Sequence, residues 1–244
     1  MVVVYGTRFY GKVAACGSSF IATRFFHIYY LPLIPVGSHL VIEENGDGSY
    51  RGLPHPFSLK SMFAGYMRVW GPFATVGALI ALGAGFSEPS EDMVDLALGV
   101  VPPAFGLLLA LAATVLAWAV IGRLSQEDKQ KRAVWALHTG IFADPADLGD
   151  ARFSIREALL GTIAERAHGL GAQGYRLPPD PRAAWAQIAL DPSQSDEGIL
   201  TAAYTLARVE GSAAAEPAKS ELARVEGSLW QRIRALNPPY LQGV

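Results

Sequence analysis

Two long apolar runs joined by a short acidic link dominate this sequence. The first run extends from Met62 to Phe86, the link covers Ser87–Asp95, and the second run extends from Leu96 to Gly122. A helix rises about 1.5 Å per residue and a hydrocarbon core needs roughly 20 apolar residues, so each run is long enough to cross a bilayer. No Lys or Arg lies between Val69 and Gly122. The pattern predicts a transmembrane helical hairpin rather than a buried helix pair of a soluble protein.

Basic residues at the ends of the two runs predict the orientation of this hairpin. Cationic residues near the ends of a span are retained in the cytoplasm, whereas acidic residues have little influence. The link is acidic and contains no base, while bases flank both runs at Lys60, Arg68, Arg123, Lys129, Lys131 and Arg132. We therefore expect an integral protein of a bacterial-type inner (cytoplasmic) membrane, with both termini in the cytoplasm and only the link outside.

Small residues recur every four positions in both runs. Because small side chains let helix backbones approach closely in lipid, we predict that two such faces pack on each other. The faces are Gly77, Ala81 and Gly85 in the first run, and Gly106, Ala110 and Thr114 in the second. The alternative is that Gly and Ala are simply common in the membrane helices of an Ala-rich protein.

Two prolines and a glycine predict where the second helix begins and ends. Pro102 and Pro103 interrupt the run early, and proline is harmless in the first turn of a helix, so the continuous helix is expected to begin there. Leu96–Val101 is then a looser or kinked segment. The helix is expected to continue past Arg123 as far as Thr139, with Gly140 as its stop.

The first 57 residues are predicted to form a small cytosolic antiparallel β domain, because β-branched and aromatic residues are dense and glycines punctuate them. Phe20–Pro32 is expected to be one long strand. Val41–Tyr50 is expected to be a hairpin turning at Asn45-Gly46 or Asp47-Gly48. Ser58 is a candidate cap for a helix that begins at Leu59 and continues into the first span. Residues 58–123 are then the membrane hairpin, and 124–244 a cytosolic helical domain.

The segment Phe25–Gly37 resembles the aromatic strand of small zinc-ribbon domains found in bacterial membrane-associated proteins. In those domains the strand lies between two cysteine pairs. The residues that match are Phe25, Phe26, His27, Tyr29, Tyr30, Pro32, Leu33, Ile34, Pro35 and Gly37. Since Cys16 is the only cysteine here, the resemblance implies a ribbon-like sheet that has lost its metal, and it implies no activity.

The carboxy-terminal half is rich in Ala, Arg and Glu and has helical periodicity. Ser154 and Glu157 are predicted to cap a helix that presents Ile155, Leu159 and Ile163 on one face. The last helix, from about Pro217, presents a longer apolar stripe made of Leu222, Val225, Leu229, Ile233 and Leu236. Packing of this stripe inside the protein, on the 155–163 face, is the favoured interpretation. Docking into the groove of a partner is the alternative.

One short sequence occurs twice in this half, since LARVEGS stands at residues 206–212 and again at 222–228. The spacing is too short for a helical-repeat array. The repetition can result from two helix ends that converged on the same local sequence, or from duplication. A helical-hairpin module that binds proteins is a further interpretation.

No motif for catalysis, metal binding or cofactor binding stands out. The formal charge of −2 gives no reason to expect nucleic acid as a partner, and a single cysteine excludes an internal disulfide. His138, Asp144 and Asp147 could supply a base or metal ligands, but carboxylates beside a turn more often cap the next helix. The membrane runs hold no ionisable side chain at depth, and that counts against a transporter.

The function expected from the sequence is that of a membrane-anchored interaction or scaffolding subunit that has no catalytic chemistry and no cofactor. Its partners are the lipid bilayer and either other proteins or a second copy, bound through the cytosolic domains. The alternative is a small channel or transport-accessory subunit formed by oligomerised hairpins. A membrane-bound enzyme using His138 and the Asp144–Asp147 turn is a more distant hypothesis.

Overall fold

A computed structural model describes residues 4–45, 49–87 and 93–243 of the chain. They form two compact units. The first comprises Met1–Ala15 and Phe20–Leu124, and therefore joins the β-rich segment to the two apolar helices. The second comprises Cys16–Ser19 and Ser125–Val244. It is helical apart from Cys16–Ser19, the turn between β-strands.

The first unit is built on a four-stranded sheet in the order β1-β2-β3-β4. The strands are β1 (Tyr5–Cys16), β2 (Ser19–Ile28), β3 (Leu31–Glu44) and β4 (Tyr50–His55), with β2–β3 and β3–β4 antiparallel. The prediction of one strand over 20–32 is wrong, because the chain reverses at Tyr29-Tyr30 and Pro32 belongs to β3. The 41–50 hairpin is present as β3–β4, while its predicted glycine turns involve residues 46–48, outside the described residues.

Two register shifts interrupt the pairing of β2 with β3, between Arg24 and Phe25 and between Phe26 and His27. They face Pro35 and Pro32 on β3. Proline cannot donate to the ladder, so it is tolerated in a paired strand only where the pairing is irregular. The proline-rich half of β3 is therefore compatible with a strand because β3 itself is irregular there, with Val36 and Leu33 as extra residues between its pairs with β2.

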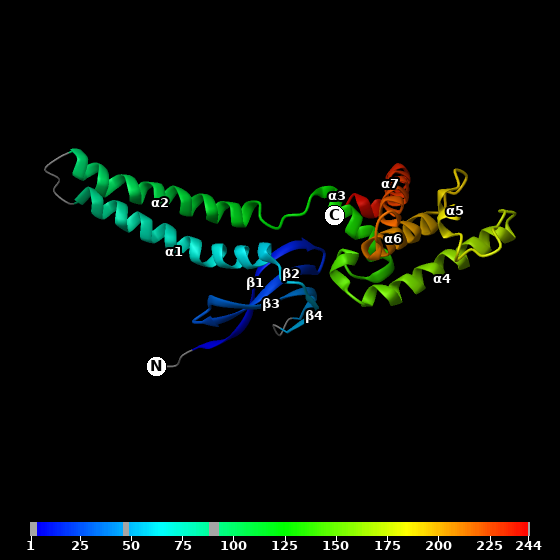
Figure 1. Cartoon of the computed structure of the whole chain (residues 1–244), viewed down its shortest axis with the longest axis horizontal. Helices are drawn as coiled ribbons and strands as arrows, with labels where there is room; N and C mark the ends of the chain where they lie inside the picture. The colour runs from blue at the N-terminus through cyan, green and yellow to red at the C-terminus, as the bar shows by residue number, and fades with distance from the viewer. Residues whose placement is uncertain (1–3, 46–48, 88–92, 244) are drawn as a thin grey trace. The chain divides into compact units, whose positions relative to one another are not determined.

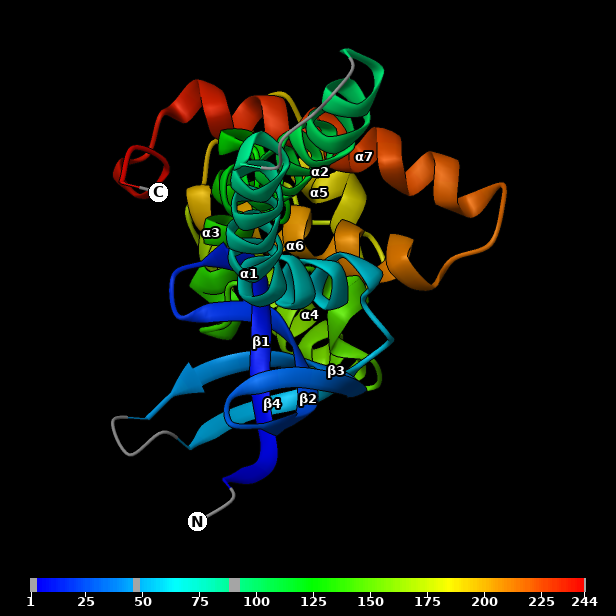
Figure 2. The same cartoon turned by 90° about the vertical axis from the view of Figure 1, so that its left-hand side faces the viewer.

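One face of the sheet packs on the first turns of the helix α1 (Leu59–Ser87), as both views show (Figures 1 and 2). A buried chain of hydroxyls joins the layers: Thr23 Oγ1 lies 3.1 Å from Ser38 Oγ and donates to Ser61 Oγ at 3.0 Å. The Ser61 hydroxyl donates in turn to the carbonyl of Gly11 at 2.8 Å. Gly11 has a φ of +66°, and a Cβ there would lie 1.9 Å from the Ser61 carbonyl oxygen, so only glycine fits this approach.

The predicted start of α1 is confirmed, since Ser58 Oγ accepts from the backbone N–H of Ser61 at 3.3 Å. The second apolar helix, α2 (Met93–Ala119), runs beside α1. The expected start at Pro102 is wrong, because α2 already begins at Met93 and holds both prolines inside it. Apolar membrane helices commonly tolerate internal proline. Residues 88–92, with most of the acidic link, lie outside the described residues.

The expected continuous helix from the second run to Thr139 is also wrong. It ends at Ala119, and a new helix, α3 (Gln126–Thr139), begins after Ser125, whose side chain accepts from the N–H of Asp128. Between them the chain turns onto β1: Gly122 has a φ of +81°, and its carbonyl accepts from the N–H of Ala14 at 2.6 Å. The predicted stop at Gly140 is confirmed, since this residue has a φ of +70° and its N–H bonds to Ala136 O.

Within the described residues, α1 and α2 are the helices long and apolar enough to cross a membrane. That finding concerns length and composition. Many large apolar side chains of both helices are exposed.

The second unit contains α3, α4 (Ala151–Ala172), α5 (Trp185–Leu190), α6 (Glu197–Ala213) and α7 (Ala218–Leu236), with the short 3-10 turns η1 (Pro145–Leu148) and η2 (Pro239–Leu241). Its centre is α6, which is buried almost throughout from Ile199 to Val209 and packs on both α4 and α7. The predicted capping box at Ser154 and Glu157 is wrong, because α4 already begins at Ala151.

Candidate functional site

The two apolar helices meet along a seam that is different from the predicted one. On α1 the covered or half-covered positions after Trp70 are Gly71, Thr75, Ala78, Leu82 and Gly85. Their spacing alternates between four and three, the pattern that keeps a seam facing one neighbour. Of the predicted face on α1, Gly77 and Ala81 are exposed, and a Cβ at Gly77 would meet nothing within 4 Å.

Among the described glycines of the two helices, Gly71 and Gly85 are in the tightest contact with the neighbouring helix. A Cβ on Gly71 would lie 2.2 Å from Thr114 Oγ1, and a Cβ on Gly85 would lie 2.2 Å from the carbonyl oxygen of Gly99. On α2 the predicted residues Gly106, Ala110 and Thr114 are all half-buried, but a Cβ on Gly106 would meet nothing within 4 Å. The structure therefore brings Thr114 and Gly85 into the seam, each against a glycine that the predicted sets leave out.

A single guanidinium joins α1, α2 and the sheet. Arg68 donates from Nε to Ala117 O at 2.9 Å, from Nη2 to Ile121 O at 3.2 Å and from Nη1 to Lys12 O at 2.7 Å. The last carbonyls of a helix have no partner within the helix, and a cation there also complements the helix dipole. Arg68 thus acts as the carboxy-terminal cap of α2 from the neighbouring helix.

The outward surface of the helix pair carries many large apolar side chains that are exposed. Large side chains with more than half of their surface exposed include Phe73, Ile80, Phe86, Leu98, Phe105, Leu108, Val115 and Trp118. Burying apolar surface is worth roughly 25 cal/mol per Å², so a surface of this kind is strongly unfavourable in water. Large exposed apolar patches on proteins commonly mark sites of interaction with membranes or with other proteins.

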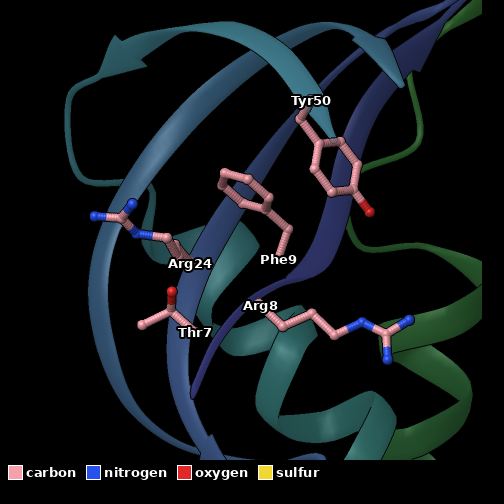
Figure 3. Close-up of a pocket in the computed structure, with 5 residues that line it drawn as sticks. All are labelled: Thr7, Arg8, Phe9, Arg24 and Tyr50. Carbon is pink, nitrogen blue, oxygen red and sulfur yellow. The ribbon is translucent and has the colours of Figure 1, made fainter. Parts of the chain in front are cut away.

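The other face of the sheet, away from α1, carries a pocket of about 450 Å³ lined by Thr7, Arg8, Phe9, Arg24 and Tyr50. The rings of Phe9 and Tyr50 stand edge to face at 5.1 Å, and the two guanidinium groups extend to opposite sides of them (Figure 3). These residues come from β1, β2 and β4, so their proximity depends on strand order. Sequence reasoning missed the pocket for this reason.

The electrostatics of this pocket favour an anionic or aromatic ligand. Arg24 Nε is buried and has no hydrogen-bond partner among the described residues. Burial and the neighbouring Arg24 guanidinium lower the pKa of His39, which stacks edge to face on Phe9 at 5.2 Å. Burial, reinforced by a hydrogen bond to Glu44, raises the pKa of Tyr50.

The residues proposed for an enzyme site lie in the second unit and serve structural roles there. His138 Nε2 lies 3.0 Å from Thr201 Oγ1. Asp144 caps η1 through the N–H of Ala146, and Asp147 lies 3.8 Å from Arg132. Within residues 4–45, 49–87 and 93–243, no three His, Cys, Asp or Glu side chains are grouped to hold a metal ion.

The two copies of the repeated sequence pair with each other. Arg208, in the first copy, is largely buried and binds Asp144, the hydroxyl of Tyr204 at 3.3 Å and Glu226 of the second copy at 3.7 Å. Burial raises the pKa of Glu226, while Arg208 opposes that shift. The equivalent Arg224 is exposed. Identical sequences therefore have different roles: one arginine holds α6, α7 and η1 together, and the other faces solvent.

The apolar stripe of α7 is divided between core and surface. Leu229 and Ile233 are fully buried, Leu222 and Val225 are half-buried, and Leu236 is 43% exposed. The stripe lies on the helix that packs most extensively on α6, where Tyr204 lies 5.5 Å from Trp230, whereas the 155–163 face of α4 was the expected neighbour. Packing inside the protein is confirmed for the centre of the stripe. Those positions are therefore not a free docking face.

Comparisons of the chain with protein-family models, with curated proteins and with solved structures found no match. The resemblance of Phe25–Gly37 to zinc ribbons stays a prediction. What the residues provide is an apolar helix pair, a basic aromatic pocket on the sheet, and a helical unit with its own core.

Proposed function

We propose that this protein is a membrane-anchored interaction subunit: α1 and α2 hold it in a bilayer, and the folded parts on the cytoplasmic side bind partner proteins. The observation that carries the proposal is the outward face of α1 and α2. It exposes Phe73, Ile80, Leu108 and other large apolar side chains without a single basic residue from Val69 to Gly122. Lipid is the solvent in which such a face is stable.

The orientation belongs to the same proposal. Bases flank the helix pair at the end where the sheet lies, including Lys60 and Arg123, while Asp95 is the described acid at the other end. Cationic flanks are retained in the cytoplasm, so both termini are cytoplasmic and the membrane is of the bacterial inner-membrane type.

The pocket around Arg24 is the proposed partner-binding site on the sheet. The Nε of Arg24, which has no hydrogen-bond partner among the described residues, and the two aromatic rings suit an acidic or aromatic side chain of another protein. The channel alternative has less support, because no charged side chain lies between Val69 and the link or between Leu96 and Gly122. Ion pathways normally contain such groups.

Crosslinking of the full chain in its native membranes tests this function. A photoreactive residue replaces Tyr50 in the pocket, and a second variant carries it at exposed Ile80 on the outward face of α1. The proposal expects Tyr50 variants to capture one reproducible set of proteins that disappears when Arg24→Gln is added, and Ile80 variants to capture mainly lipid. Protein crosslinks confined to Ile80 would instead favour oligomerised hairpins.

A further inference from the structure

The tip of the β2–β3 hairpin, residues 28–36, is an unusual turn for a water-soluble sheet. Ile28 pairs with Leu31, so the turn itself consists of Tyr29 and Tyr30, with φ of 48° and 65°. Two-residue hairpin turns with positive φ at both positions are normally made by Asn and Gly, which adopt it with little strain. Here two large aromatic residues occupy that backbone.

The tip is apolar over its whole surface. Residues 28–36 contain no charged side chain. The exposed fractions are 36% for Ile28, 44% for Tyr29, 57% for Tyr30, 38% for Leu33, 61% for Ile34 and 50% for Val36. Exposed loop ends in water are rich in polar residues and glycine, so this composition points to a surface that is covered in use.

Two hydrogen bonds fix the tip beside α1 at one particular level. Tyr66 Oη donates to Leu33 O at 2.6 Å, and Trp70 Nε1 donates to Pro32 O at 2.9 Å. The hairpin runs alongside α1 toward the end that carries the apolar face (Figure 1). From Gly71 to Ser87 the helix rises about 25 Å, close to the roughly 30 Å of a hydrocarbon core. Trp70 therefore marks the level at which α1 would enter lipid.

Other side chains at this level are typical of a membrane surface. Gly71 lies against Thr114 and Arg68 binds Ala117 O, so Trp118 of α2 is close to the level of Trp70. The Arg8 guanidinium lies 5.7 Å from the ring of Tyr30. Tyrosine and tryptophan gather where headgroups meet acyl chains, and arginine attracts lipid phosphate.

We propose that the β2–β3 tip inserts into the bilayer interface, in the leaflet from which α1 enters. The occupant of this surface is lipid, because the tip is continuous with the outward apolar face of α1 beyond Trp70. The tip sets the depth of the helix pair and holds the sheet against the membrane. The inference rests on the proposed function, since it requires α1 and α2 to span a bilayer.

Spin labels on single cysteines test the insertion in the full chain, reconstituted in vesicles of phosphatidylcholine and phosphatidylglycerol. In a Cys16→Ala background, labels replace Ile34 at the tip, Ile80 on the outward face of α1, and exposed Arg51 on β4 as a matched site on the same sheet. Collisions with oxygen report contact with lipid, and collisions with a water-soluble nickel chelate report contact with water.

The proposal expects the oxygen-to-nickel ratio at Ile34 to be several-fold higher than at Arg51 and to approach the ratio at Ile80. A water-like ratio at Ile34 with a lipid-like ratio at Ile80 overturns the insertion and leaves the membrane anchor intact. A label at Ile34 shielded from both reagents also overturns it, because the tip is then covered by protein. A water-like ratio at Ile80 overturns the proposed function itself.

Discussion

Gly85 of α1 and Gly99 of α2 meet backbone to backbone: a Cβ built on Gly85 would lie 2.2 Å from the Gly99 carbonyl oxygen. At the other end of the seam, Gly71 lies against the side chain of Thr114, because a Cβ on Gly71 would lie 2.2 Å from Thr114 Oγ1. The threonine hydroxyl donates to Ala110 O at 2.7 Å, so no polar group of this side chain is left unpaired. Both contacts require a residue without a side chain on α1.

This contact predicts different effects for two substitutions on α1. Gly85→Leu forces the helices apart, since the clash is with backbone that cannot rotate away, and should cost roughly 1–3 kcal/mol of stability. Ala81→Leu, four residues earlier and exposed, should change stability by less than about 0.5 kcal/mol. Thermal unfolding of the full chain in detergent measures both. Equal losses for the two variants would show that the seam is not the one described.

The sidedness of the hairpin can be measured with cysteines placed on the described residues. In a Cys16→Ala background, Met93→Cys stands at the start of α2 and is 88% exposed, and His168→Cys stands on the exposed face of α4. With two spans, an impermeant maleimide should label Met93→Cys on intact cells, and His168→Cys only after the membrane is opened. Labelling of both positions in intact cells would contradict the hairpin topology.

Two local signals in the sequence predicted local structure correctly, whereas the capping box at Ser154 and the helix start at Pro102 were wrong. Ser58 caps α1 and Gly140 ends α3, because each forms hydrogen bonds with residues three or four positions away in the chain. The helix break near Gly122 was not predicted, since its cause is a contact with Ala14, more than a hundred residues earlier. No pattern around Gly122 alone contains that information.

The predicted face on α1 departs from the observed seam for a geometric reason. Residues four apart on a helix turn by about 400°, so each step drifts by about 40°, and a seam must alternate steps of three and four to stay in contact. Gly77, Ala81 and Gly85 follow steps of four only, and the first two therefore leave the seam. The pocket at Arg24 was missed because its residues meet through strand order, which the sequence does not state.

Arg68 should contribute strongly to the stability of the first unit. Arg68→Gln removes charge-assisted bonds to three carbonyls, two of them at the end of α2, and we expect a loss of roughly 2–3 kcal/mol. The matched control is Arg123→Gln, because Arg123 is exposed and lies just past the same helix end. Hydrogen exchange of α2 amides in detergent measures the effect. An equal effect from both variants would mean that charge, and not the cap, is responsible.

The core of the second unit can be tested on a single helix. Leu229 is fully buried in α7, and a carboxylate there has no partner, so Leu229→Asp should destabilise the unit by several kcal/mol, about 3–5. Leu236→Asp, on the same helix and 43% exposed, should cost less than about 1 kcal/mol. Hydrogen exchange of α6 amides in the full chain measures both. Unchanged protection in Leu229→Asp would contradict the packing of α7 on α6.

The stability of the second unit should fall in mild acid because of His138. Burial, together with the nearby Arg166, lowers the pKa of this imidazole, whose Nε2 lies 3.0 Å from Thr201 Oγ1. The unfolded chain therefore binds a proton at the ordinary histidine pKa of about 6.5, while the folded unit still holds His138 neutral. The contribution of His138 to the free energy of unfolding is fully present above about pH 6.5, the unfolded pKa, and is lost as the pH falls toward the lowered pKa of the folded unit. His138→Gln should weaken the pH dependence of the unit's stability. His168→Gln, at an exposed position of α4, should leave that pH dependence unchanged. The measurement is exchange of α6 amides across this pH range, and an identical slope in the wild type and His138→Gln would assign the acid sensitivity to other groups.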